Sequence, residues 1–288
     1  MVLYPDGTKY VGGWVGGFRK GAGVLYRTDG EKCVGHWTED QLIGRSMRFG
    51  VHGERYEGEF AFGEVRHGEG TQHFPNGDVY AGMWVHGVRH GIGTFAHQNG
   101  DVYTGPFQND KKHGIGAYYY KDGDRYEGSF VEGVKTGKGS YYYANGNTYI
   151  GEWLNDLKHG TGKYTYAAGA LAGVEYDGAW KDGVRHGRGT VTYANGTVFE
   201  GHFENDFEEG PGVLRTVDGD DYSGEWHGGM KHGRGVYRYG NGDVYEGAWE
   251  DNVKHGDGDY YHRDGDFYKG VGSPREAHNE YSKCQLHI

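Results

Sequence analysis

The chain is poor in cysteine, in proline and in long apolar stretches. Its 288 residues include 5 prolines and 2 cysteines, Cys33 and Cys284, which lie far apart. A disulfide scaffold or a cysteine-based zinc site is therefore excluded, and a reducing compartment is expected. No run of 18 apolar residues occurs, and the N-terminal MVLYPDGTKY lacks the basic and apolar regions of a secretory signal. These absences predict a cytoplasmic protein with no membrane span.

Positive charge is also in deficit, since the formal net charge is -11. A nucleic acid or an anionic membrane is then an unfavourable partner for the surface as a whole, although a local basic stripe remains compatible with this charge. The 58 glycines and a mean hydropathy of -0.85 approach the composition of a disordered chain. The 26 tyrosines, 12 phenylalanines and 7 tryptophans oppose that interpretation, because so many rings indicate packing.

The aromatic residues recur with a period of about 23 residues, which indicates a repeat architecture. The repeat starts at an aromatic residue, or once at a cysteine, with glycine two positions later and, in the first eleven units, tryptophan or phenylalanine four positions later. The twelve starts are Tyr10, Cys33, Tyr56, Tyr80, Tyr103, Tyr126, Tyr149, Tyr176, Phe199, Tyr222, Tyr245 and Tyr268. One extra residue in the unit at Tyr56 and four in the unit at Tyr149 are expected to fall in turns.

Each unit is predicted to be one β-hairpin. The alternation in Tyr-x-Gly-x-Trp has the period of two that is typical of a strand. Asn-Gly or Asp-Gly follows a second alternating run, and this dipeptide predicts a type I′ turn with two residues at positive φ. Stacked hairpins predict an all-β fold, an elongated, twisted, single-layer antiparallel ribbon of about twelve repeats. The expected organisation is a partial repeat at 1–9, an array at 10–272 and a polar tail at 273–288.

The pattern Tyr-x-Gly-x-Trp-x-x-Gly-x-x-His-Gly-x-Gly, as in YDGAWKDGVRHGRG from Tyr176 to Gly189, resembles the MORN repeat. Runs such as YYYANGNTYIGEWLNDLKHGTGKYTYAAG are similar to the MORN arrays of radial spoke head proteins of cilia and flagella. The resemblance implies a scaffold for cytoskeletal, ciliary or membrane-contact assemblies, with no catalysis by the repeats. The chain departs from the pattern at Ile43, Ser46 and Glu209.

Two rows of side chains are candidate partner surfaces. The first is an aromatic face, expected to supply packing and, where uncovered, partner contact: Trp14, Trp37, Trp84, Trp153, Trp180, Trp226 and Trp249. The second is a basic edge beside one set of turns, and a long polyanionic partner would be attracted by all of its charges together. It consists of Arg19, Arg66, Arg89, Lys112, Lys135, Lys158, Arg185, Lys231 and Lys254. Solvation of the turns is the preferred explanation of the basic row. An acidic row is expected at the opposite edge: Asp78, Asp101, Asp124, Asp220, Asp243 and Asp266.

No residue is a candidate for catalysis, for metal binding or for binding a cofactor. Seven histidines share one place in the repeat, but neighbours about 10 Å apart are too distant to share a zinc ion, so a role in the turn is favoured. GVKTGKGS, from Gly133 to Ser140, does not have the spacing of a phosphate-binding loop. The sequon at Asn195 lies in a predicted turn of a chain with no signal peptide.

The preferred hypothesis is a non-enzymatic scaffold in a cytoskeletal or ciliary assembly, with a radial spoke head component as its finer form. Its partners are other proteins of a cytoskeletal or axonemal complex, or a second copy in a homodimer, and not nucleic acid. Its location is cytoplasmic, at the cytoskeleton or the axoneme. The alternative is a peripheral module that binds phosphoinositide membranes through the basic edge, and an enzyme is the third option.

Overall fold

A computed structural model describes residues 1–272, so the polar tail expected at 273–288 lies outside the described residues. The chain divides into two compact units, Met1–Gly137 and the part from Lys138 onward, and each is described by itself. Within residues 1–272 the secondary structure is β-strand apart from one 3₁₀ turn at Gly169–Leu171, and no helix there is long and apolar enough to cross a membrane. The predicted all-β class is confirmed.

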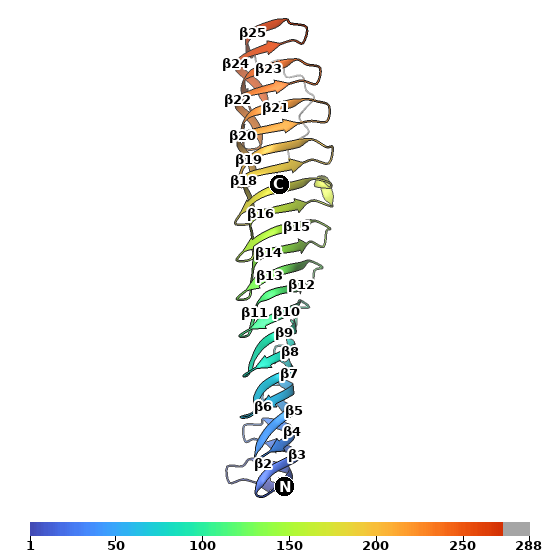
Figure 1. Cartoon of the computed structure of the whole chain (residues 1–288), viewed down its shortest axis with the longest axis vertical. Coiled ribbons are helices and arrows are strands. Elements are labelled where there is room, and N and C mark those ends of the chain that lie inside the picture. Colours follow the sequence, from blue (N-terminus) through green and yellow to red (C-terminus); the bar gives the residue numbers. More distant parts are fainter. Residues whose placement is uncertain (273–288) are drawn as a thin grey trace. The chain divides into compact units, whose positions relative to one another are not determined.

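The strands alternate between seven and nine residues in most repeats, and Figure 1 shows them as successive rungs within each unit. The first unit holds β1 (Val2–Leu3), β2 (Lys9–Val15), β3 (Phe18–Tyr26), β4 (Lys32–Thr38), β5 (Gln41–Phe49), β6 (Arg55–Ala61), β7 (Val65–His73), β8 (Val79–Val85), β9 (Val88–Ala96), β10 (Val102–Gln108), β11 (Lys111–Lys112), β12 (Gly114–Tyr119), β13 (Arg125–Val131) and the start of β14 (Val134–Tyr142).

The second unit begins within β14. It continues with β15 (Thr148–Leu154), β16 (Leu157–Thr165), β17 (Glu175–Lys181), β18 (Val184–Thr192), β19 (Val198–Glu204), β20 (Phe207–Arg215), β21 (Asp221–His227), β22 (Met230–Arg238), β23 (Val244–Glu250), β24 (Val253–Tyr261) and β25 (Phe267–Gly272). Its strands pair antiparallel with their neighbours in sequence, for example β15 with β16 and β16 with β17. The described extra residues of the unit at Tyr149 include the 3₁₀ turn, as predicted.

Glycine pairs bring the tyrosine ring down onto the backbone. Gly151 lies opposite Gly162, and a Cβ on Gly162 would approach within 2.5 Å of the Tyr149 hydroxyl oxygen. That hydroxyl donates to the carbonyl oxygen of Glu152 at 2.8 Å. Beside the pair the ladder shifts register at a bulge, and Gly160 there has a φ of +62°, which favours glycine. Bare glycine backbone on both strands therefore leaves the space that the Tyr149 ring occupies.

The rings form a continuous series in the second unit, and in the first unit the series is interrupted at Cys33. The Tyr149 ring meets Trp153 of its own repeat edge to face at 5.2 Å, and it meets Trp180 of the next repeat in the same way at 5.2 Å. In the first unit Tyr80 makes the equivalent contacts with Trp84 and Phe107 at 5.1 and 5.0 Å. Such T-shaped pairs add about 1 kcal/mol each beyond the area they bury. Each repeat therefore shelters its rings against the following one.

The prediction of type I′ turns at Asn-Gly and Asp-Gly is wrong. In the loop Pro5-Asp6-Gly7 only the glycine has positive φ, and the Gly7 N–H donates to the Tyr4 carbonyl oxygen at 3.0 Å. This is a three-residue loop with a left-handed glycine, and the Asp6 carboxylate accepts from the Thr8 N–H at 2.9 Å. Two successive residues with positive φ occur at the other edge, for example Asn155 at 48° and Asp156 at 69°.

The second repeat shows how the chain replaces the tyrosine. Cys33 occupies its position and is fully buried, and burial raises the pKa of this thiol to about 11. The glycine that would lie under the ring is replaced by Ser46, which is 4% exposed and donates to the Ile43 carbonyl oxygen at 3.4 Å. The smaller Cys33 in place of the tyrosine thus accompanies the larger Ser46 in place of the glycine.

Candidate interaction surfaces

The basic row lies over the aromatic rings. The Arg19 guanidinium is 4.3 Å from the ring centre of Trp37 in the next repeat, and its Nε donates to the Asp40 carboxylate at 3.1 Å. Arg89 with Asp110 and Arg185 with Asp206 repeat this arrangement. The side chains of Arg19, Arg89 and Arg185 are 16%, 20% and 8% exposed. The expectation that these arginines present an edge to a partner is therefore corrected, because they bind the turn of the following repeat.

The lysines of the row occupy the same place. The Lys158 ammonium is 4.0 Å from the ring centre of Trp180. The ammonium groups of Lys112, Lys231 and Lys254 each lie 4.6 Å from a tyrosine ring centre, and that of Lys135 lies 5.5 Å from one. Arg66 lies 4.1 Å from the ring centre of Trp84. A cation over a ring face gains about 1 to 2 kcal/mol where it is desolvated. Lys112 and Lys231 also lie 5.2 and 5.1 Å from ring centres of the following repeat, and Lys135 and Lys254 lie 5.9 and 5.3 Å from ring centres of the preceding repeat. The row therefore joins successive repeats.

We predict a pH effect from Lys158. Burial lowers the pKa of its ammonium from 10.5 to about 8. Between these two values the unfolded chain binds more protons than the folded chain, so the contribution of Lys158 makes the free energy of unfolding rise with pH. Urea unfolding at about pH 7 and about pH 9.5 should show that this part of the rise is absent in Lys158→Met. Lys163→Met, at an exposed lysine, should retain it, and equal behaviour of the two variants would refute the effect.

Burial decides what the tryptophans contact. Trp37, Trp84, Trp153, Trp180, Trp226 and Trp249 are at most 7% exposed. Trp180 also donates its indole N–H to the Gly162 carbonyl oxygen at 2.9 Å. These six rings are occupied by packing between repeats, so a partner that touches tryptophan directly remains a proposal for the half-buried Trp14 alone.

The acidic row also joins neighbouring repeats. Asp101 accepts from the Lys121 backbone N–H at 2.9 Å and from the Tyr118 hydroxyl at 3.0 Å. Asp220 makes the same pair of contacts with Gly240 and Tyr237, and Asp243 with Arg263 and Tyr260. In the unit at Tyr126 the position is taken by Asn147, which accepts from the Ala167 N–H and donates to the Tyr164 hydroxyl oxygen. Hydrogen bonding between repeats is therefore what this position provides, with or without charge.

Acid should weaken these contacts. The backbone N–H of Lys121, followed by the Asn99 and Tyr118 side chains, lowers the pKa of Asp101 below its usual 3.8. A depressed carboxyl pKa contributes stability above the unfolded value, and the contribution is lost as pH falls through the folded value. Asp101→Asn, which copies the natural Asn147, should therefore lose less stability between pH 7 and about pH 3 than the native chain. Urea unfolding with Asp257→Asn as the exposed control measures this, and identical losses in both variants would contradict it.

The histidine row lies beside the bulges. His159 and His232 each place Nδ1 within 4 Å of an aspartate of the next turn. Among residues 1–272, no group of three or more histidine, cysteine, aspartate or glutamate side chains could hold a metal ion. Glu208 replaces the cation in the unit at Phe199, and burial raises the pKa of its carboxyl.

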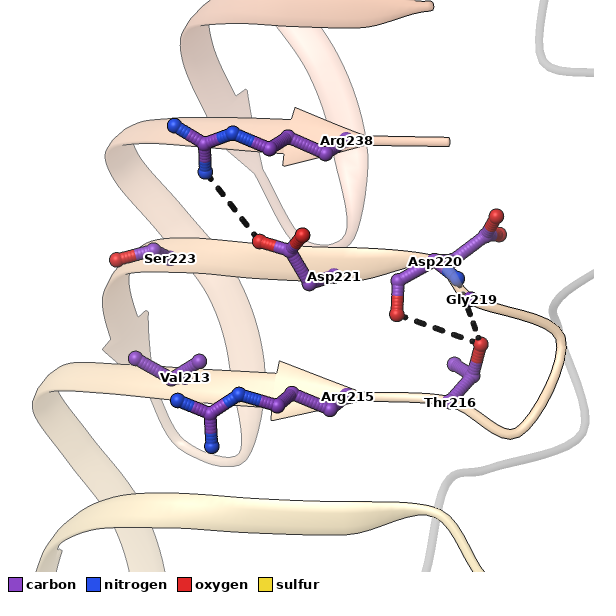
Figure 2. Close-up of a pocket in the computed structure, with 8 residues that line it drawn as sticks. All are labelled: Val213, Arg215, Thr216, Gly219, Asp220, Asp221, Ser223 and Arg238. Carbon is purple, nitrogen blue, oxygen red and sulfur yellow. Dashed lines mark hydrogen bonds and ion pairs between the residues drawn. The ribbon is translucent and has the colours of Figure 1, made fainter. Parts of the chain in front are cut away.

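The face that points away from the rings differs from repeat to repeat. Figure 2 shows Arg215, Asp221 and Arg238 following one another on this face of β20, β21 and β22. Arg238 pairs with Asp221 at 3.3 Å, and Arg215 pairs with Glu200 at 3.4 Å. The side chains border a shallow, open hollow of about 450 Å³. Because each of these charges has an opposite neighbour, the hollow has no excess charge that would select an anion or a cation.

Several solved structures are distantly similar to this chain. The TCP domain of Drosophila melanogaster SAS-4 is 15% identical with a TM-score of 0.34, covering 54% of this chain and 81% of its own. The TCP10 domain of Danio rerio CPAP is 12% identical with a TM-score of 0.27, covering 87% and 98%. Virginiamycin B lyase of Staphylococcus aureus is 9% identical with a TM-score of 0.16, covering 92% and 88%. Likeness this low carries no functional argument.

No curated protein matches the sequence. The MORN repeat family model matches ten segments, and the units it leaves unmatched begin at Cys33 and Tyr268. The matched residues are 10–32, 56–79, 80–102, 103–125, 126–148, 149–170, 176–198, 199–221, 222–244 and 245–267. With most of the chain matched, and with the tyrosines, glycines and tryptophans of the motif forming its interior, the chain belongs to the MORN repeat family.

Proposed function

We propose that this chain is a non-enzymatic scaffold that holds protein partners within a cytoskeletal or ciliary assembly. The most specific form of this proposal is a component of a radial spoke head. One observation carries the proposal: the residues that repeat face inward and contact one another, whereas the residues that face outward change from repeat to repeat. Membership of a repeat family known as a scaffold for protein or membrane interaction supports the same conclusion.

The inner positions are nearly constant because each has a structural task. Tyr149 packs over Gly162, Trp180 packs on Tyr149, and Lys158 covers Trp180. The outer positions have no such task. The residue that follows the first tyrosine of a repeat faces outward. In five successive repeats it is Ala81, Thr104, Glu127, Ile150 and Asp177.

This arrangement suits the recognition of several partners in order. Two strands per repeat at about 4.8 Å each place equivalent outer positions about 10 Å apart within a unit. Pairing on both sides of most strands keeps that spacing fixed. A partner can then be selected by the side chains of one or two repeats while the interior stays unchanged.

Proximity labelling in ciliated cells tests the proposal. The native chain should enrich cytoskeletal or axonemal proteins, and Arg215→Glu/Arg238→Glu should change the set that is enriched, because these side chains are outside the packed interior. Enrichment of no protein assembly would contradict the proposal. Phosphoinositide vesicles provide the alternative outcome: co-sedimentation with them would favour a membrane role, which requires basic side chains now held over rings.

A further inference from the structure

Four neighbouring strands of the first unit have an outer face that is poor in charge. Twelve of its positions, three on each of β8, β9, β10 and β12, carry no Asp, Glu, Lys, Arg or His, and His90 at the bulge of β9 borders them. They are Val79, Ala81, Met83, Ile92, Thr94, Ala96, Val102, Thr104, Pro106, Ile115, Ala117 and Tyr119. A sheet face that meets water normally alternates polar residues with the buried ones, and here that polar complement is reduced to two threonines and a tyrosine. We call these twelve positions the neutral patch.

The apolar part of the neutral patch is a row that crosses the strands. Met83 faces the bulge of β9 between Arg89 and Gly93, Ile92 in that bulge lies opposite Pro106, and Ile115 follows on β12. Ile92 is 62% exposed and Ile115 is 78% exposed. Pro106 lacks the N–H that a strand residue donates, and the partner strand is interrupted there into β11 and β12. Two exposed isoleucines on the two sides of a proline make a contiguous apolar row, which is unusual on a free surface and indicates a covered one.

The borders of the row are chemically different. Glu69 lies directly opposite Met83 on β7, and the exposed Glu59 follows on β6. At the other border Ile115 lies opposite Ser129, which is uncharged. An occupant should therefore be apolar across four strands and basic at one end only. The acidic border also opposes an anionic membrane surface.

The dimensions favour a single helix over a second copy. Four strands at about 4.8 Å and three outer rows about 7 Å apart cover about 400 Å², half of the roughly 800 Å² per partner of a standard interface. The strand spacing is close to the helix pitch of about 5.4 Å, so a helix laid across the strands would place one side chain per turn on each strand. About 16 residues would reach from β12 to β6.

We propose that the neutral patch binds an amphipathic helix of a protein partner, with leucine-like residues over Met83, Ile92, Pro106 and Ile115, and lysine or arginine over Glu69 and Glu59. The inference rests on the proposed function and names the partner chemistry for one place on the scaffold. The tyrosine and tryptophan interior takes no part, since those rings are buried on the opposite side of the strands.

The test uses the full chain and a phage-displayed library of random peptides of about 16 residues, with counter-selection on Ile92→Glu/Ile115→Glu. Selected peptides should have an apolar stripe with helical spacing and basic residues at one end. Fluorescence anisotropy should show at least about tenfold weaker binding to Ile115→Glu and to Ile115→Thr. Ile150→Glu, at an outer isoleucine that is 55% exposed, should bind as the native chain does. Glu59→Lys/Glu69→Lys should lose the preference for a basic end.

Three results would overturn the inference. Peptides that bind the Ile92→Glu/Ile115→Glu chain as tightly would place the site elsewhere and leave the scaffold proposal standing. A stable dimer in sedimentation that Ile115→Glu dissociates would assign the neutral patch to a second copy. If no peptide is selected and Ile115→Glu labels the same proteins as the native chain, the proposal that a helix binds here is refuted. The proteins labelled by the native chain still test the scaffold proposal separately. Circular dichroism confirms that each variant is folded.

Discussion

Gly162→Ser is expected to destabilise the second unit by about 3 kcal/mol, because the new side chain enters the space of the Tyr149 ring. The tyrosine hydroxyl oxygen lies 2.5 Å from the ideal Cβ position, and the glycine opposite, Gly151, also leaves no room for the backbone to move. Equilibrium urea unfolding followed by circular dichroism measures the loss. Gly270→Ser is the control, since a Cβ there meets nothing within 4 Å.

The second repeat shows how the loss can be recovered. There Cys33 replaces the tyrosine and Ser46 replaces the glycine, and both are buried. Tyr149→Cys alone should cost about 4 kcal/mol through the cavity that it leaves. Tyr149→Cys/Gly162→Ser should be less destabilised than the sum of the single variants by about 2 kcal/mol. Strict additivity in this cycle would show that the ring and the glycine are not coupled.

Trp180→Ala is expected to cost about 4 kcal/mol, whereas Trp14→Ala should cost about 1 kcal/mol. Trp180 is 4% exposed, meets Tyr149 and Tyr176 edge to face, and lies under the Lys158 ammonium. Trp14 is half-buried and meets Tyr10 of its own repeat at 5.4 Å. Urea unfolding of the two variants measures the difference. Equal losses would contradict the claim that neighbouring repeats supply the shelter.

The repeat period was sufficient to predict the hairpins and their order. It was sufficient because each of these features depends on contacts between adjacent repeats. Such contacts recur with the same period as the sequence. The insertion after Tyr149 was predictable for the same reason, since extra residues cannot enter a paired strand without breaking its register.

The place of the basic row was not predicted because the two-residue turn was assigned to the wrong edge. With the turn at Asn155 and Asp156, Trp153 lies directly opposite Lys158, so both side chains are on one face. Asn-Asp and Glu-Asp are weaker turn signals than Asn-Gly, and this explains the choice. The neutral patch is not singled out by the sequence pattern, because it depends on positions that the repeat leaves variable.

The most direct test is the rate at which Lys111 and Lys112 react with an acylating reagent, followed by mass spectrometry of the folded chain. The Lys111 side chain is 56% exposed, whereas the Lys112 ammonium lies 4.6 Å from the Tyr118 ring centre and 5.2 Å from that of Phe130. If the basic row joins repeats, Lys112 should react several-fold more slowly than Lys111, and the two rates should become equal on unfolding. Equal rates in the folded chain would place the row in solvent and contradict the account.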